Sequence, residues 1–195
     1  MSFYDASVDL SPAVVPDTAG LKALAHPVRL KMLGLLRVDG PATATSLAER
    51  LGLNSGATSY HLRQLAAHGF IVDDAERGNG RERWWMAAHR STRTSSDTLV
   101  TPDGDSHEAQ EGYLRAVAMT YVEQLQDAVE ERAFLPAEWR SATTFSDWVL
   151  RLSPARARAL LEAVESVIED APEGDDTEVP YVIQVQAFPR PGTAS

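Results

Sequence analysis

Two short predicted helices separated by only three residues constrain the fold of this chain more than any other feature. The first lies in "TATSLAERL", follows Thr43, and ends at Gly52. The second begins after Asn54 and runs through "SGATSYHLRQL". Threonine and asparagine commonly cap helix N-termini, and glycine commonly ends a helix. A short helix, a tight turn containing glycine and a second helix are typical of a helix-turn-helix.

The second of these helices has a polar outer face. Thr58, Leu62 and Leu65 recur at helical spacing, so we expect them to point into the core. In a DNA-binding helix-turn-helix, the N-terminal half of this helix contacts base edges in the major groove. The residues predicted to contact DNA are Ser55, Ala57, Ser59, Tyr60, His61 and Arg63. The alternative for each is an ordinary solvated helix surface, and for His61 also a hydrogen bond within the protein.

A predicted β-hairpin follows directly, in "GFIVDDAERGNGRERWWMAAHR" (residues 69–90). Its two strands flank "RGNGR", and paired glycines around asparagine are typical of a hairpin turn. A hairpin after a helix-turn-helix indicates a wing, whose guanidinium groups can reach phosphates or the minor groove. The wing residues predicted to contact DNA are Arg77, Asn79, Arg81 and Arg83. Ion pairs with Asp73, Asp74 or Glu76 are the alternative for the arginines.

The order of these motifs resembles a known family. "LAHPVRLKMLGLL", "LAERLGL", "SYHLRQLAAHGFI" and "GNGRERWW" follow one another over roughly residues 20–90, as in the winged-helix domain of ArsR-type transcriptional regulators. The resemblance implies a dimer that binds double-stranded DNA. It also implies a protein that in most cases represses genes until an effector releases it.

The charge distribution agrees with one basic segment in an acidic chain. The net charge is -10, yet residues 21–93 carry 11 Lys/Arg against 6 Asp/Glu, a local charge of +5. Residues 94–195 carry 7 against 19, a local charge of -12. Because contact with phosphates depends on local charge, only residues 21–93 are a candidate for DNA binding.

Metal sensing and catalysis are disfavoured. The chain has no cysteine, which excludes disulfides, thiolate nucleophiles and cysteine metal sites. The histidines lack a tight ligand spacing, although His107, Glu108 and Glu111 are a weak candidate for a site shared across a dimer. We therefore expect no cofactor, no metal and no enzyme activity. No signal peptide and no membrane helix are recognisable, so we expect a cytoplasmic protein with no membrane partner.

The second half begins with a polar linker (residues 94–106) and a long helix over 107–134. The apolar stripe predicted on this helix is Leu114, Val117, Tyr121 and Leu125. It forms either a dimer seam or a cover for the chain's own core. A strand (143–154), a helix beginning at Ser153-Pro154 and a second strand (179–191) then predict a small β-α-β module. A low-ranked effector pocket would use Tyr113, Tyr121, Phe145 and Trp148, which are otherwise ordinary core aromatics.

Together these features predict a mainly helical α+β protein. The expected domains are a flexible arm (1–18), a winged helix-turn-helix (19–93), the linker (94–106) and a dimerisation and effector domain (107–195). The predicted function is sequence-specific transcriptional regulation by a homodimer, most simply a repressor reading a palindromic operator and released by a non-metal small molecule. The alternative is a winged helix that binds protein and no operator.

Overall fold

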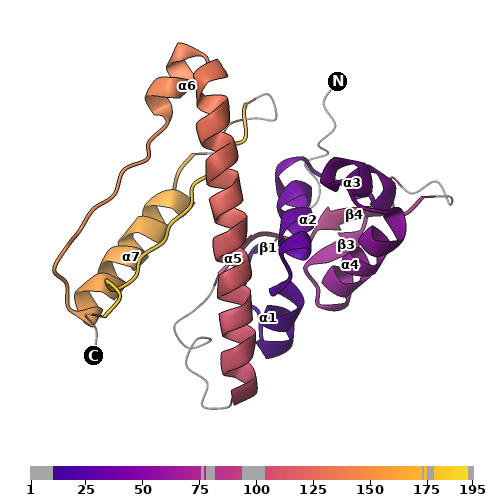
Figure 1. The fold of residues 1–195 in the computed structure, drawn as a ribbon, viewed down its shortest axis with the longest axis horizontal. Helices are drawn as coiled ribbons and strands as arrows, with labels where there is room; N and C mark the ends of the chain where they lie inside the picture. Colours follow the sequence, from indigo (N-terminus) through magenta and orange to yellow (C-terminus); the bar gives the residue numbers. More distant parts are fainter. Residues whose placement is uncertain are drawn as a thin grey trace. The chain divides into compact units, whose positions relative to one another are not determined.

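The computed structural model describes residues 11–75, 77, 82–93, 104–172, 174 and 178–192 (Figure 1). The chain divides into two compact units, residues 3–128 and residues 129–195. The division therefore falls near the end of the long helix, whereas the linker was expected at 94–106.

Four helices build the N-terminal unit, and each begins at a side chain that accepts a backbone hydrogen bond. These helices are α1 (Thr18–Leu24), α2 (Pro27–Val38), α3 (Ala44–Leu51) and α4 (Ser55–Ala67). Asp17 caps α1, His26 caps α2, and Asn54 caps α4. Thr43 and Ser46 form a reciprocal capping box at α3. The caps expected at Thr43 and Asn54 are confirmed.

Two small sheets accompany the helices. The three-stranded sheet has the order β2 (Ala42–Thr43), β4 (Trp84–Ala87), β3 (Ile71–Asp73), and both pairings are antiparallel. The predicted hairpin is therefore present as β3 and β4. A second sheet pairs β1 (Ser11–Val14) in parallel with β5 (His89–Thr92). The flexible arm expected over residues 1–18 is thus wrong for its last part, because β1 hydrogen-bonds to a strand far along the chain.

One apolar core holds the N-terminal unit together. Its fully buried large side chains come from α1, α2, α3, α4 and β3, with Phe70 just before β3: Leu21, Leu24, Met32, Leu33, Leu36, Leu47, Leu62, Leu65, Phe70 and Ile71. Gly20 lies against this core, where an added Cβ would stand 3.2 Å from the Phe70 ring. The close approach of α1 to Phe70 therefore depends on the missing side chain at Gly20.

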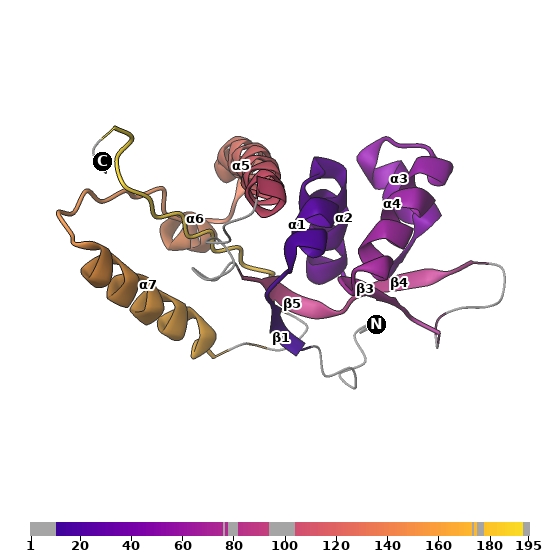
Figure 2. The same ribbon diagram turned by 90° about the horizontal axis from the view of Figure 1, so that it is seen from below.

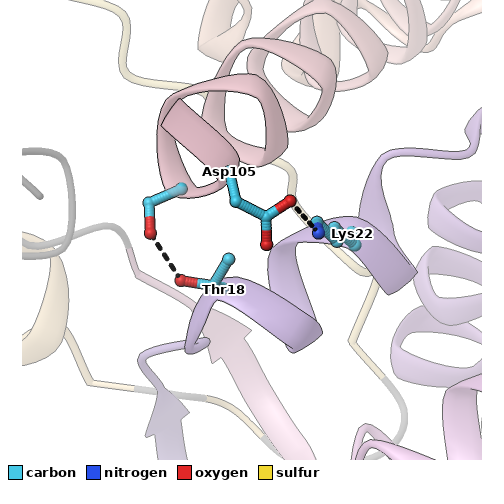
Figure 3. A network of polar contacts seen from close by, with 4 residues as sticks. Thr18, Lys22 and Asp105 are labelled. Carbon is cyan, nitrogen blue, oxygen red and sulfur yellow. Dashed lines mark hydrogen bonds and ion pairs between the residues drawn. The ribbon is translucent and has the colours of Figure 1, made fainter. Parts of the chain in front are cut away.

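The long helix α5 (Gly104–Glu131) packs on the same unit with its first half. Ala109, Tyr113 and Ala116 are buried on its inner face, and a Cβ at Gly112 would lie 3.2 Å from the Cβ of Ala25, the residue that follows α1. At its start, Thr18 Oγ1 lies 3.0 Å from Ser106 Oγ, and Lys22 forms an ion pair with Asp105 (Figure 3). These polar contacts join α1 to the first turn of α5.

The C-terminal unit is helical where a helix was predicted and irregular where strands were predicted. A 3-10 turn (Arg132–Phe134) leads to α6 (Ala137–Ala142), and α7 (Pro154–Glu169) begins at Ser153 as expected. Residues 143–153 and 179–190 form neither helix nor strand, and both views draw them as plain threads (Figures 1 and 2). The two strands of the β-α-β module are therefore wrong, because each segment lacks a strand to pair with among the described residues.

Replacement of Phe70 by alanine tests the core. Phe70 is 1% exposed and contacts residues from several helices, so Phe70→Ala should lower the free energy of unfolding by about 3–5 kcal/mol. Urea denaturation of the full chain, followed by circular dichroism, measures the loss. Val72→Ala is the matched control, because Val72 lies nearby on β3 but is exposed. A loss as small as that of the control would contradict the placement of Phe70 in the core.

Candidate nucleic-acid interface

Helix α4 turns one face to the core and the other to solvent. Thr58, Leu62 and Leu65 are completely buried, as the helical spacing predicted. Thr58 also donates from Oγ1 to the carbonyl of Asn54 (3.1 Å), which ties the first turn to its own cap. Three buried residues at this spacing fix the rotation of the helix about its axis. Their burial therefore determines which residues of α4 face solvent.

The outer face at the start of α4 is polar and accessible. Ser55, Tyr60 and Arg63 are exposed, and the Tyr60 side chain is 52% accessible. Ala57 and Ser59 are half-buried on the same helix. The Asn54 side chain accepts from the Ala57 amide (2.8 Å), and Arg63 Nε donates to the Ser59 carbonyl (3.2 Å). The structure thus brings five of the six predicted contact residues together on one accessible surface.

His61, the sixth, is half-buried, and its ring packs against two neighbouring rings. Its ring lies 4.6 Å from that of His26 and 5.5 Å from that of Tyr60, measured between centroids. Its Nδ1 atom is buried and has no hydrogen-bond partner within the described residues. At Nδ1 the internal hydrogen bond is absent from the part of the chain that the structure describes, and contact of the half-buried His61 with DNA stays a prediction. The His61 ring connects α4 to His26, the N-cap of α2. There the Val28 amide donates to His26 Nδ1 (3.2 Å).

Both histidines are surrounded by groups that disfavour protonation. Burial lowers the pKa of His61 below its usual 6.5, and the charges of His26 and Arg29 lower it further. Burial and Arg29 also lower the pKa of His26, against a smaller opposing effect of its backbone hydrogen bond. Arg29 is held in place because its guanidinium donates to the carbonyls of Ala23 and Lys22 at the end of α1. At neutral pH this cluster therefore contributes packing, and its only charge is that of Arg29.

Two wing arginines pair with neighbouring acids. Arg83 Nε lies 2.6 Å from an Asp73 oxygen, and its guanidinium stacks 4.2 Å from the Trp85 ring centroid. Arg77 Nε lies 3.1 Å from an Asp74 oxygen. The ion-pair alternative left open by the sequence is thus what the structure shows for Arg77 and Arg83. Asn79 and Arg81 lie outside the described residues.

Arg37 is a cation that the sequence did not single out. It is largely buried and donates to the His89 carbonyl (3.0 Å) and to Thr92 Oγ1 (2.9 Å). Burial lowers its pKa to about 10, while Tyr113 and Tyr121 on α5 oppose that shift. Burial also raises the pKa of Tyr113 to about 12. Arg37 therefore joins α2 to β5 beside α5, and no sequence signal separates it from a surface arginine.

The predicted stripe on α5 is divided between two surroundings. Val117 packs against the core of its own unit, whereas Leu114 and Leu125 are exposed. The outward apolar positions with coiled-coil spacing are Ala118, Val122, Leu125 and Val129. Ala118, Val122 and Val129 do not belong to the predicted stripe. Their four-three-four spacing was visible in the sequence, but a second apolar stripe on the same helix competed with it.

The remaining candidate residues fall in different places. Of the four residues of the predicted effector pocket, Tyr113 and Tyr121 belong to the N-terminal unit, and Phe145 and Trp148 to the C-terminal unit. Among the described residues, no group of three or more histidine, aspartate or glutamate side chains is placed to hold a metal ion. None of the helices within the described ranges is long and apolar enough to span a membrane.

The fold and the exposed face of α4 define a winged helix-turn-helix domain. Residues 24–73 match the sequence profile of a family described as "Helix-turn-helix domain". The chain is also similar to the HTH-type transcriptional regulator NmtR of Mycobacterium tuberculosis, with 42% identity over 64 residues. That alignment covers 33% of this chain and 52% of NmtR, so it spans about half the length of the relative.

Two solved structures also resemble parts of the chain. Reduced HlyU of Vibrio cholerae is 23% identical, covers 47% of this chain and 79% of its own, and has a TM-score of 0.31. The apo form of a ZitR mutant of Lactococcus lactis is 14% identical, covers 73% and 80%, and has a TM-score of 0.32. Scores this low carry no argument.

The profile match and NmtR confirm the resemblance seen in the residues. Over its N-terminal part, the chain carries a helix-turn-helix domain of the kind found in DNA-binding transcriptional regulators of the ArsR/SmtB type.

The histidine cluster predicts how stability depends on pH. A histidine whose pKa is lower in the folded state than in the unfolded chain binds fewer protons when folded. The free energy of unfolding should therefore be highest above pH 6.5 and fall as the pH drops below that value. His61→Gln should make this fall shallower, with His68→Gln, at the exposed end of α4, as the control. Urea titrations between pH 5 and 7.5 measure it, and an equally steep fall in His61→Gln would refute the role of His61.

Proposed function

We propose that this chain is a dimeric transcriptional repressor that reads a palindromic DNA operator through α4. The observation that carries the proposal is the accessible polar face at the start of α4, held outward by three completely buried residues on its other side. A rigid helix with small polar side chains at its N-terminal end suits insertion into the major groove. The matches to a helix-turn-helix family and to NmtR support the same conclusion.

Each exposed side chain of α4 suits a different part of DNA. The Ser55 and Ser59 hydroxyls can donate to or accept from base edges and phosphates. Tyr60 can donate from its phenol to a phosphate, and its packing against His61 limits its motion. Arg63 can form a bidentate contact with a guanine or approach a backbone oxygen. Ala57 offers a methyl group to thymine. The positive end of the helix adds attraction for phosphate.

Binding to two half-sites requires a second copy, and α5 offers a surface for it. Val122, Leu125 and Val129 are exposed, and with Ala118 they recur at coiled-coil spacing. A coiled-coil seam needs apolar residues every three or four positions, which these four supply. Leu114 is exposed on the same helix and can extend the contact. Tyr121 and Val117, which the sequence placed in this seam, are half-buried within their own unit.

The proposed effector is a small organic molecule. The chain has no cysteine and the described residues hold no metal-ligand cluster, so the donor chemistry does not favour a metal. Aromatic side chains suit an organic molecule, and Tyr113 and Tyr121 of the N-terminal unit are the proposed contacts. Tyr113 and Tyr121 face the cationic Arg37, which favours an effector with anionic character.

A second candidate function is protein binding without an operator. It is favoured by the pairing of several basic side chains in the N-terminal unit: Lys22 with Asp105, Lys31 with Glu123, Arg50 with Asp39, Arg77 with Asp74, and Arg83 with Asp73. Such pairs reduce the attraction for phosphates. Surface ion pairs are weak, however, and a phosphate can replace the carboxylate at small cost. We therefore place DNA binding first.

Arg63→Ala should weaken binding to the operator about 10- to 100-fold, because a guanidinium contact to a base contributes roughly 1–3 kcal/mol. Anisotropy with a labelled duplex from the upstream region of the gene, in excess nonspecific DNA, measures the change. Arg115→Ala on α5 removes an arginine that is 77% exposed and should leave binding unchanged. Equal binding by the Arg63 and Arg115 variants would refute the assignment of Arg63.

Arg81→Ala should weaken binding to all sequences alike. A phosphate contact releases counterions, so its removal should reduce the slope of log K against log salt by about one unit. Titrations of specific and nonspecific duplexes at several salt concentrations measure both slopes. An unchanged slope would remove Arg81 from the phosphate contacts, and Lys31→Ala, on an ion-paired cation of α2, controls for the loss of a charge.

A further inference from the structure

The C-terminal unit has no core of its own. Among its described residues from Val129 to Gly192, none is buried. Its large apolar side chains are instead accessible to solvent, up to 91% for Val149, 78% for Trp148 and 76% for Phe188. A unit of this size normally buries more than half of the surface that the unfolded chain exposes. Without that burial nothing offsets the entropy lost when the segments are ordered.

Most of the exposed apolar side chains follow the period of a β-strand, and those on the opposite phase are Phe145, Val149, Val182 and Phe188. Trp148, Leu150 and Leu152 alternate with Val149 and Arg151 along the first segment, residues 143–152. In the second segment, residues 179–189, Tyr181, Ile183 and Val185 lie at every other position. Period-two patterning is what a strand half-buried in a sheet requires. Neither segment belongs to a sheet, so the described residues of one copy do not contain the partner strands that this pattern requires.

Contacts of Tyr181 with α6 hold the second segment in position. Tyr181 donates from its phenol to the Ala142 carbonyl (2.6 Å), and its ring stacks on Trp139, with centroids 6.2 Å apart. Pro180 and Pro189 bracket residues 181–188, and a proline cannot donate to a neighbouring strand. The available pairing length is therefore the eight residues "YVIQVQAF", which is long enough for an ordinary strand.

We propose that residues 129–192 form their core only with the same residues of a second copy of this chain, with segments 143–152 and 179–189 of each copy supplying strands to the other. The resulting contact is isologous, as in a twofold dimer that exchanges elements. The proposal goes beyond the α5 seam of the proposed function and rests on that function only for the existence of a dimer.

Charge at the two segments argues against a basic partner and permits contact with a second copy. Residues 94–195 carry a local charge of -12, so two copies repel each other over most of this half. The two segments do not contribute to that repulsion because both have zero net charge. Segment 179–189 has no charged residue, and segment 143–152 has one acid and one base. A basic partner would be attracted to acidic surfaces, but these segments offer it none. Neutral apolar strands in an acidic half therefore suit contact between identical chains.

The exposed area of these side chains also fits contact with a second copy. An aromatic side chain buries roughly 150–250 Å², so covering the exposed parts of Phe134, Phe145, Trp148, Tyr181 and Phe188 would hide about 600–700 Å² per copy. A stable interface takes about 800 Å² from each partner. The exposed aliphatic side chains supply more than the area that remains after the aromatic side chains are counted.

The test combines mass and amide exchange on the purified full chain without DNA. Sedimentation equilibrium should give a dimer. Hydrogen exchange followed by mass spectrometry should show protected amides in 144–152 and 181–188, and this protection should decrease as the protein is diluted toward monomer. A monomeric chain, or a dimer in which both segments exchange freely, would overturn the proposal. So would protection that develops only after a cell extract is added, because a foreign partner would then be the occupant.

A charged substitution supplies the matched comparison. Ile183→Glu places a carboxylate in the proposed interface, whereas Val72→Glu places one on β3 of the N-terminal unit; the two side chains are 55% and 43% exposed. Ile183→Glu should weaken dimerisation on the order of 100-fold and remove protection from both segments, including the unmutated 144–152. Protection in α2 and α4 should persist, which shows that the chain still folds.

Val72→Glu should behave like the wild type in mass and exchange. If Ile183→Glu dimerises as tightly as Val72→Glu, the proposal fails. Because neither measurement uses DNA, this failure is distinct from a failure of operator binding, which the Arg63→Ala comparison tests.

Discussion

Burial of one stripe of α4 is the constraint on which the rest of the N-terminal unit depends. Thr58, Leu62 and Leu65 are completely buried, and they contribute to the same core as α2 and Phe70. Once these side chains are inside, the opposite face of the helix can only be polar and outward. The accessible surface at Ser55, Tyr60 and Arg63 is therefore a consequence of core packing, which also holds it in place.

Electrostatics in this chain acts locally. The helix-turn-helix segment is basic within an acidic protein, yet several of its cations already have carboxylate partners on the surface. Such pairs keep arginines such as Arg83 in position at little cost, and its stacking on Trp85 adds to this. DNA binding by such a surface would depend on exchange of carboxylates for phosphates and so would be sensitive to salt.

The two units of the chain differ in whether a single copy forms a hydrophobic core. The N-terminal unit buries ten large apolar side chains and satisfies its helix N-termini with its own caps. The C-terminal unit leaves its apolar residues accessible and its extended segments without strand partners among the described residues. A chain of this kind gains stability from association, so its folding and its oligomeric state are linked.

The sequence by itself determined the local elements: the caps at Thr43 and Asn54, the inner stripe of α4, the hairpin, and the start of α7. These follow from short-range rules of capping and periodicity. Only the tertiary structure determined the contacts between residues that lie far apart in the sequence. It placed β1 beside β5, turned His61 onto His26, paired Arg83 with Asp73, and left residues 143–152 and 179–189 without strands. A strand exists only when another strand accepts its hydrogen bonds, and no period within one segment can supply that partner.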